Sequence, residues 1–273
     1  MGATEAPVVR RYEGYSSFEF ERLEGDVLRI TLANPRNEVN AVDGAMHEDL
    51  RRLFEELKME DEARAILLTG SGRAFSAGGD FAWMSSVTTD DLSAMRQEGK
   101  QIVWNLLDVE IPIVAAVNGP AIGLGATLAL LADVIYMADD ATLADPHVKV
   151  GLVAGDGGAV IWPLVLGPAQ AKRYLMTGDP LSAAEAERLG LISGALPAEE
   201  LQDAALEFAR RLAAGAPLAV RYTKASVNQL VKQALTTAFD YSTALELLTF
   251  VSADHQEALR ALAARETPRF EGR

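Results

Sequence analysis

The first half of the chain alternates hydrophobic and polar positions in short segments that predict β-strands. Residues 18–22 and 27–32 alternate at every second position on either side of a Gly25-Asp26 turn, which is typical of a β-hairpin with one buried face. Unbroken apolar runs rich in β-branched residues predict further strands that are buried on both faces. These runs cover residues 64–69, 111–117, 134–138 and 142–144.

Helical spacing separates these strands and then dominates the C-terminal third. Hydrophobic residues three and four positions apart predict helices over residues 42–57 and from about 88 to 107. After Gly158 the strand patterns largely stop. Helical patterns follow over residues 169–176, 183–189, 201–214, 218–235, 238–251 and 253–264. Strands that alternate with helices of this length predict βαβ units, so the fold class is α/β with a mostly parallel sheet.

This order of elements divides the chain into three parts. Residues 1–16 are expected to form a flexible arm, residues 17–200 an α/β core, and residues 201–273 an all-helical C-terminal segment. The C-terminal helices carry more apolar surface than a chain end needs, which indicates that they pack against other subunits. The side chains concerned are Phe239, Tyr241, Leu245, Leu248, Phe250 and Val251.

Composition narrows the classes of partner. With 39 acidic and 25 basic residues, the chain of 273 residues has a net charge of −14, which argues against binding to nucleic acid or anionic membranes. The lack of cysteine excludes disulfides, thiolate metal sites and cysteine nucleophiles. No apolar run reaches the length of about 18 residues that a membrane span requires, and residues 1–13 lack a hydrophobic signal region. We therefore expect a cytoplasmic protein.

Two glycine-rich turns are the main candidates for chemistry. Residues 75–80 follow the strand at 64–69, and residues 118–125 follow the strand at 111–117 and open an apolar helix. A strand, a turn stripped of side chains and a helix start leave backbone N–H groups free to bind a ligand. Two such turns on neighbouring strands can give one N–H each to a single oxygen, which makes an oxyanion hole.

Two other interpretations of the glycines fit less well. Gly70-Ser71-Gly72 follows a strand as in a dinucleotide-binding loop, but the third glycine of that motif is missing. The segment 75–78 approximates the nucleophile elbow of serine hydrolases, but Ala74 stands where that motif has glycine. A structural role in tight turns and close packing of helix on sheet remains compatible with the oxyanion hole.

The two turns and their flanking sequences resemble the enoyl-CoA hydratase/isomerase (crotonase) superfamily, and the likeness covers nearly the whole chain. The matching segments are residues 34–41, 74–80, 112–121, 181–186, 190–192, 252–254 and 268–270. The resemblance implies a ββα spiral core, an acyl-CoA substrate, and assembly as a homotrimer or a dimer of trimers through residues 201–273. It implies no metal and no cofactor other than the CoA that is part of the substrate.

The resemblance also assigns residues to the binding site. The backbone N–H groups of Gly79 and Leu124 correspond to the oxyanion hole, with Ala77 and Gly123 beside them in the two turns. Other positions implied to contact the substrate are Phe81, Trp83 and Met84 in the acyl pocket, Thr127 on the helix after the second turn, and Arg36 near the CoA phosphates.

The acid–base positions depart from the family pattern. Family hydratases use two glutamates, which correspond here to Thr127 and His147, so the two-glutamate hydration reaction is in doubt. His147 can exchange protons near neutral pH. Asp156, in the sequence Gly155-Asp156-Gly157-Gly158, is either the N-cap of a helix or a base. His47 and His255 are expected to be exposed helix residues, and Glu246 fits an interface, a buried ion pair or catalysis.

Hydration or isomerisation of an enoyl-CoA is the function that the resemblance favours, and two alternatives remain. Asp156 and a following Val-Ile-Trp-Pro run, together with His147, also resemble the family's carbon–carbon bond hydrolases that cleave β-diketones. Those relatives have a further histidine where this chain has Leu124. The second alternative is a relative that binds acyl-CoA without catalysis.

Overall fold

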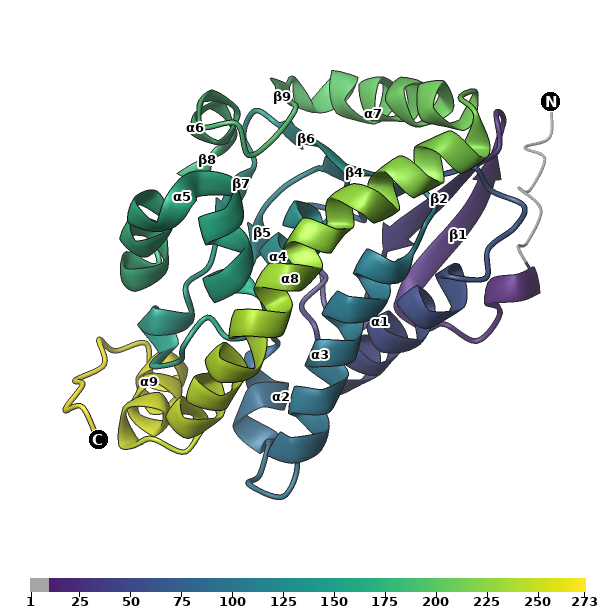
Figure 1. The fold of residues 1–273 in the computed structure, drawn as a ribbon. Helices are drawn as coiled ribbons and strands as arrows, with labels where there is room; N and C mark the ends of the chain where they lie inside the picture. Colours follow the sequence, from purple (N-terminus) through teal and green to yellow (C-terminus); the bar gives the residue numbers. More distant parts are fainter. Residues whose placement is uncertain (1–9) are drawn as a thin grey trace.

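The structure, a computed structural model, describes residues 10–273 (Figure 1). Its first two strands form the predicted hairpin. Strands β1 (Phe18–Leu23) and β2 (Val27–Leu32) pair antiparallel. Gly25 and Asp26 both have positive φ angles, +86° and +59°, as turns that match the twist of a hairpin require.

The hairpin begins a six-stranded sheet in the order β1-β2-β3-β4-β6-β9, in which every pair after the first is parallel. The further strands are β3 (Ala65–Gly70), β4 (Ile113–Val117), β6 (Val134–Ala138) and β9 (Gly194–Leu196). A smaller sheet contains β5 (Ala121–Ile122), β7 (Thr142–Ala144) and β8 (Leu181–Ser182). The predicted strands are confirmed, whereas β5, β8 and β9 are too short to leave a pattern in the sequence.

Helices cover the large sheet and build the cavity described below. Helix α1 (Gly44–Leu57) begins at the N-cap Asp43, whose carboxylate accepts a hydrogen bond from the N–H of Met46, and packs on α3 (Leu92–Asp108). Helix α7 (Ala198–Ala213) packs directly on β3, β4 and β6. It is therefore a layer of the core, although most of its residues fall in the predicted C-terminal segment, residues 201–273.

The helices after β7 differ from the expected ones in length. Helix α5 (Gly158–Thr177) begins earlier than predicted and is kinked at Gly167, where φ is +73° and Pro168 follows. The two helices expected at 218–235 and 238–251 are one helix, α8 (Pro217–Phe250), which runs across the front of Figure 1. Helix α9 (Ala253–Ala264) has the predicted bounds. The shorter helices are α2 (Phe81–Ser86), α4 (Leu124–Leu130), α6 (Ala183–Arg188) and the 3₁₀ turns η1 (Arg10–Tyr12) and η2 (His147–Val150).

The expected N-terminal arm lies partly outside the described residues, which exclude positions 1–9. Its remainder is packed rather than free: Tyr12 is only 3% exposed and its ring stacks on Phe20 at a centroid distance of 4.6 Å. Over the described part of the chain, the helices are too short or too polar to cross a membrane.

Candidate active site

The two glycine-rich turns lie side by side at the end of the parallel strands. Ser76 and Ala121 form an isolated parallel bridge, in which the N–H of Ser76 donates to Pro120 and that of Ile122 donates back to Ser76. Gly78 (φ +77°) passes so close to the second turn that a Cβ atom there would lie 2.6 Å from the carbonyl oxygen of Ile122. Only glycine allows this approach.

The N–H of Gly79 is held away from its strand neighbour. Val42 and Gly79 form a parallel bridge in which the N–H of Val42 donates to Gly78 (2.7 Å) and the N–H of Asp80 donates to Val42 (2.9 Å). In such a bridge the flanking residues make the hydrogen bonds, so the N–H of Gly79 itself points to the other side. That side is the wall of a cavity.

Leu124, the first residue of α4, lines the same cavity. The N-cap Gly123 has φ +53° and its own N–H donates to Ala144, while the carbonyl of Gly123 accepts from Thr127. The first N–H groups of a helix have no acceptor within the helix. Gly79 and Leu124 therefore line the same space from the two glycine-rich turns.

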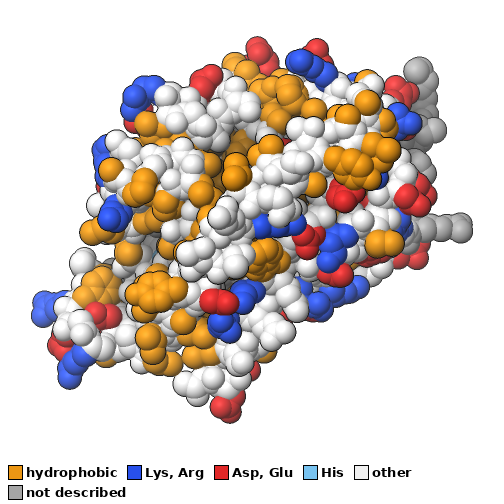
Figure 2. Space-filling model, in the orientation of Figure 1, with side chains coloured by type: hydrophobic (Ala, Val, Ile, Leu, Met, Phe, Trp, Pro, Cys, Tyr) orange, Lys and Arg blue, Asp and Glu red, His pale blue; other side chains and the backbone are white. Residues whose placement is uncertain are grey.

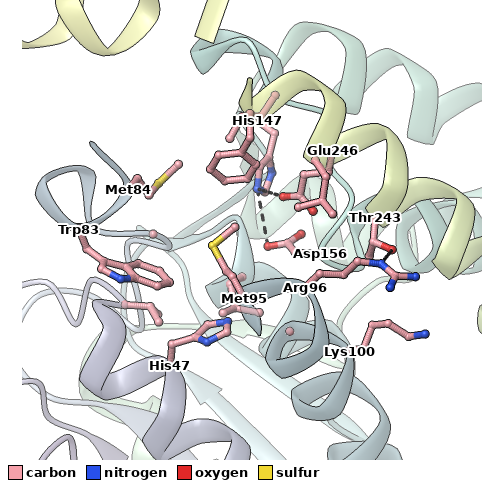
Figure 3. Close-up of a pocket in the computed structure, with 17 residues that line it drawn as sticks. His47, Trp83, Met84, Met95, Arg96, Lys100, His147, Asp156, Thr243 and Glu246 are labelled. Atoms are coloured by element: carbon pink, nitrogen blue, oxygen red, sulfur yellow. Dashed lines mark hydrogen bonds and ion pairs between the residues drawn. The ribbon is translucent and has the colours of Figure 1, made fainter. Parts of the chain in front are cut away.

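This space is an open cavity, drawn in Figure 3. Its walls come from the start of α1, the first glycine turn with α2, helix α3, the second glycine turn with η2, and the C-terminal part of α8. The wall is formed by Val42, His47, Gly79, Trp83, Met84, Met95, Arg96, Gly99, Lys100, Leu124, His147, Leu152, Asp156, Thr243, Glu246, Leu247 and Phe250.

A buried histidine stands among three carboxylates on one side of the cavity. The Nδ1–H of His147 donates to Asp145 Oδ1 at 2.5 Å. Its Nε2 lies 3.6 Å from Asp156 Oδ2 and 3.9 Å from Glu246 Oε1, as the dashed lines in Figure 3 show. The side chains are 14% exposed for His147, 0% for Asp145, 20% for Asp156 and 13% for Glu246, so their charges act on one another with little screening by water.

These surroundings shift the pKa of each of three groups upwards. Burial works to lower the pKa of His147, but the negative charges of Asp145, Asp156 and Glu246 outweigh it and raise the pKa well above its ordinary value. Burial raises the pKa of Asp156, and burial together with the charge of Asp156 raises the pKa of Glu246 to about 8. The upward shifts move the pKa values of Asp156 and Glu246 towards the neutral range in which proton transfer is effective.

Asp145, His147 and Asp156 also place one potential metal-ligand atom each within 4.8 Å of the others, although their sequence spacing indicated no metal site. One oxygen of Asp145 accepts the hydrogen bond from Nδ1 of His147, and its other oxygen has no hydrogen-bond partner among the described residues. Because Asp145 fixes Nδ1 as the protonated ring nitrogen, Nε2 is the atom that faces the cavity, which suits an acid–base group.

The structure brings together six of the residues that the sequence proposed for the site: Gly79, Trp83, Met84, Leu124, His147 and Asp156. Five others are not part of the cavity wall. Arg36 forms an ion pair with Asp43, Thr127 is fully buried, and Phe81 is 45% exposed. Ala77 donates its N–H to Val39, and Gly123 lies behind Leu124 as the N-cap of α4.

The structure decides between the two roles considered for Asp156, and the exposure expected of His47 and His255 is wrong. The N-cap of α5 is Gly157, with no side-chain cap, so Asp156 is not the capping residue and turns towards His147 instead. His47 and His255 are not exposed: they are 5% and 1% exposed. Sequence reasoning also missed Asp145 altogether and left the role of Glu246 open, although both contact His147.

Comparison with known proteins agrees with this architecture. The model of the enoyl-CoA hydratase/isomerase family matches residues 22–273. The chain belongs to this family. A probable enoyl-CoA hydratase of Mycobacterium leprae is 33% identical over 88% of this chain and 93% of its own length. The 1,2-epoxyphenylacetyl-CoA isomerase of Escherichia coli is 32% identical over 94% and 99%.

Solved structures give the same fold. An enoyl-CoA hydratase/isomerase of Mycobacterium paratuberculosis superimposes with a TM-score of 0.86 and 38% identity, over 91% of this chain and 99% of its own. A β-diketone hydrolase of the cyanobacterium Anabaena, bound to (S)-3-oxocyclohexyl acetic acid, superimposes with a TM-score of 0.83 and 31% identity, over 90% and 98%. The family enzyme has the expected crotonase-type α/β fold, and its neighbours include enzymes of both candidate reactions.

Proposed function

We propose that this family member is an acyl-CoA enzyme that holds the thioester carbonyl between the N–H groups of Gly79 and Leu124. The observation that carries the proposal is that both donors line the cavity that also contains the buried His147 cluster. When a proton leaves the carbon beside the thioester, the electron pair moves onto the carbonyl oxygen, and the two N–H groups stabilise that charge. Loss of one such donor typically costs about 10²–10³ in rate.

In this proposal the His147 cluster moves the proton. His147 is held cationic by its carboxylate neighbours, and Glu246, with a pKa of about 8, keeps a proton near neutral pH. The cluster can therefore give a proton to a substrate carbon or oxygen and take one back. Thr127 stands where the family's first glutamate would be, so one acid–base cluster serves for hydration or isomerisation of an enoyl-CoA.

Cleavage of a β-diketone is the second candidate, and two observations favour it. Nε2 of His147 faces both Asp156 and Glu246, and the Anabaena β-diketone hydrolase superimposes on 90% of the chain. In that reaction water adds to one carbonyl carbon, and the bond between that carbon and its neighbour breaks. The electron pair becomes the enolate of the other carbonyl, held by Gly79 and Leu124, and the carbon then regains a proton.

Thermal stability with four ligands separates these candidates: crotonyl-CoA, acetoacetyl-CoA, free CoA and a cyclic β-diketone. A ligand that binds only the folded protein, at 100 times its dissociation constant, adds about 2.7 kcal/mol to the free energy of unfolding. We expect stabilisation by the thioesters and their turnover. Stabilisation by the diketone alone contradicts the acyl-CoA proposal, and binding of thioesters without turnover indicates a relative that binds without catalysis.

We further propose that the protein assembles as a homotrimer or a dimer of trimers and needs no cofactor beyond the CoA of its substrate. Exposed apolar side chains along α8 support the assembly, and Figure 2 shows hydrophobic side chains spread over the face that α8 crosses. The side chains include Leu218, Tyr222, Val227, Leu230, Tyr241 and Leu248. Sedimentation velocity of the purified protein tests the assembly, and a monomer at micromolar concentration contradicts it.

A further inference from the structure

A second carboxylate–imidazole pair lines the cavity, on the side away from His147. His47, in the first turn of α1, is 5% exposed, and its Nδ1 lies 2.9 Å from Glu98 Oε2 on α3. In Figure 3 His47 reaches in from α1, whereas His147 and Glu246 enter from the opposite side. Asp145–His147 and Glu98–His47 thus make the same pairing on two walls of one cavity.

The partner of Nδ1 determines what Nε2 can bind. A carboxylate only accepts, so Glu98 fixes the proton on Nδ1. Nε2 then accepts a hydrogen bond when the ring is neutral and donates one when it is protonated. Gly99 of α3 lines the cavity beside this ring, and a Cβ atom at position 99 would lie 4.0 Å from Nε2. Trp83 packs beside the ring at a centroid distance of 5.4 Å and fixes its orientation.

His47 also lies close to the oxyanion hole along the backbone. Val42 is bridged to Gly79, α1 begins two residues later, and the N–H of His47 donates to the carbonyl of Asp43 at 2.8 Å. The first turn of α1, which carries His47, therefore follows directly on the segment that pairs with Gly79, and His47 and Gly79 line the same cavity. A substrate whose carbonyl is held at Gly79 lies in the cavity that His47 also faces.

An electrostatic effect connects the two walls. Burial raises the pKa of Asp156, and among the smaller contributions the charge of His47 lowers it. His47 thus acts on Asp156 across the cavity. Two cations of α3, Arg96 and Lys100, also line the cavity. Both form ion pairs with Asp240 and neither pairs with Glu98, whose carboxylate bonds His47.

We propose that His47 binds a second oxygen of the substrate, carried by the β carbon, so that the enzyme selects 3-oxo or 3-hydroxy compounds over unsubstituted acyl groups. This inference rests on the proposed function, because it places the first oxygen between Gly79 and Leu124. Neutral Nε2 accepts from a hydroxyl or enol, and protonated Nε2 donates to a carbonyl. A hydrogen bond that one ligand makes and another lacks changes affinity by about tenfold.

The chain contains three histidines, which makes nitrogen NMR of the imidazoles a direct test. The ¹⁵N-labelled protein is titrated with acetoacetyl-CoA, butyryl-CoA and a cyclic β-diketone, and the signals are assigned with single His→Gln variants. We expect acetoacetyl-CoA to shift the signals of His47 and His147, and butyryl-CoA to shift His147 alone. His255, whose Nδ1 bonds the carbonyl of Val150, is the internal reference.

Variants provide an independent measurement. His47→Asn keeps an amide near the position of Nδ1 and removes Nε2, so the dissociation constant of acetoacetyl-CoA should rise about tenfold while that of butyryl-CoA stays unchanged. His47→Gln, which places an amide near Nε2, should recover part of the loss. Glu98→Gln should weaken acetoacetyl-CoA binding, whereas the control Glu48→Gln should not, since Glu48 pairs with Arg51.

The outcomes separate the two proposals. If both probes with a second oxygen shift His147 but leave His47 in place, the His47 inference is overturned and the acyl-CoA proposal stands. If the diketone shifts both histidines and neither thioester shifts any, the acyl-CoA proposal fails and the role of His47 is supported. A His47 signal that stays in place with every probe, or equal loss of both thioesters in His47→Asn, overturns the inference.

Discussion

Carboxylates at two places in this protein are largely shielded from water and have opposite properties. Glu60, beside the N-terminal hairpin, has a side chain that is 0% exposed, and it accepts hydrogen bonds from Tyr12, from the N–H groups of Glu62 and Ala63, and from Arg22. Burial works to raise its pKa, but these donors outweigh burial and lower it. Glu60 therefore stays ionised and joins the hairpin to the end of α1.

The carboxylates around His147 have fewer such donors. Asp156 Oδ1 and Asp145 Oδ2 have no hydrogen-bond partner among the residues that the structure describes, and His147 is the common neighbour of all three carboxylates. With few donors, burial dominates and raises the pKa of Asp156 and of Glu246. The balance between burial and hydrogen-bond donors therefore decides whether a carboxylate serves as a structural anion or as a proton carrier.

The largest effect that we expect is on catalysis, and it tests the contrast between Glu60 and the carboxylates around His147. His147→Gln should lower kcat/KM by about 10³, which is about 4 kcal/mol in the barrier, because the amide cannot carry the proton. The free energy of unfolding should change much less. Steady-state kinetics and chemical denaturation measure the two quantities, with Tyr12→Phe as the control. A Tyr12→Phe enzyme as inactive as His147→Gln would show that the two regions do not differ in role.

Asp156→Asn should lower kcat/KM by about 10², or about 2.7 kcal/mol, without loss of stability. One oxygen of the Asp156 carboxylate has no hydrogen-bond partner among the described residues. The neutral amide therefore removes a charge that hydrogen bonds satisfy only in part, and this should not lower stability. Denaturant midpoints of the wild type and of Asp156→Asn at pH 7 test whether stability is kept. A marked loss of stability would mean that Asp156 is a structural anion like Glu60.

Glu60→Gln should have the reverse result. It should cost about 2 kcal/mol of stability, because the amide replaces an anion that accepts from Tyr12, Arg22 and two backbone N–H groups. The kinetics should be unchanged, since Glu60 lies outside the cavity wall. Urea unfolding gives the loss, and the neighbouring exposed Glu62→Gln is the matched control. A drop in kcat/KM for Glu60→Gln at full folding would contradict the assignment.

The sequence predicts the frame of the site because its signals are local. Each glycine turn directly follows a strand, and a sheet of parallel strands brings such turns to one edge, so the meeting of Gly79 and Leu124 follows from short segments. His147 and Asp156 were found through their positions in the family pattern. The cluster around Glu60 leaves no such signal, since its side-chain donors Tyr12 and Arg22 lie 48 and 38 positions away along the chain.

The remaining site residues depend on tertiary contacts that periodicity does not encode. His47 occupies the helical face that was expected to be in solvent, but α3 covers it with Glu98. Glu246 reaches His147 from a helix 99 residues away. That helix was expected to break near Thr236 and Thr237, yet both hydroxyls donate to carbonyls one turn back and the helix continues. Packing of distant segments decides the positions of His47 and Glu246, whereas local hydrogen bonds carry α8 through Thr236 and Thr237.

The smallest expected effect is the pH dependence of stability, which should have opposite signs for Glu246 and Glu60. The pKa of Glu246 is raised from 4.5 to about 8, so its contribution to stability is fully present below pH 4.5 and is lost as the pH rises to about 8. The lowered pKa of Glu60 has the opposite sign: its contribution is present above the ordinary pKa of 4.5 and is lost as the pH falls through the folded value.

Glu246→Gln isolates the first of these two contributions. Glutamine resembles the protonated acid, so the stability of the variant relative to the wild type should increase from pH 4.5 to pH 8, on the order of 1 kcal/mol, because His147 and Asp156 share the charge. Thermal unfolding across this pH range measures it, with Glu60→Gln run in parallel. Parallel profiles for the wild type and Glu246→Gln would mean that Glu246 is already ionised at pH 5. The carboxylates around His147 would then resemble Glu60, and the contrast between the two clusters would fail.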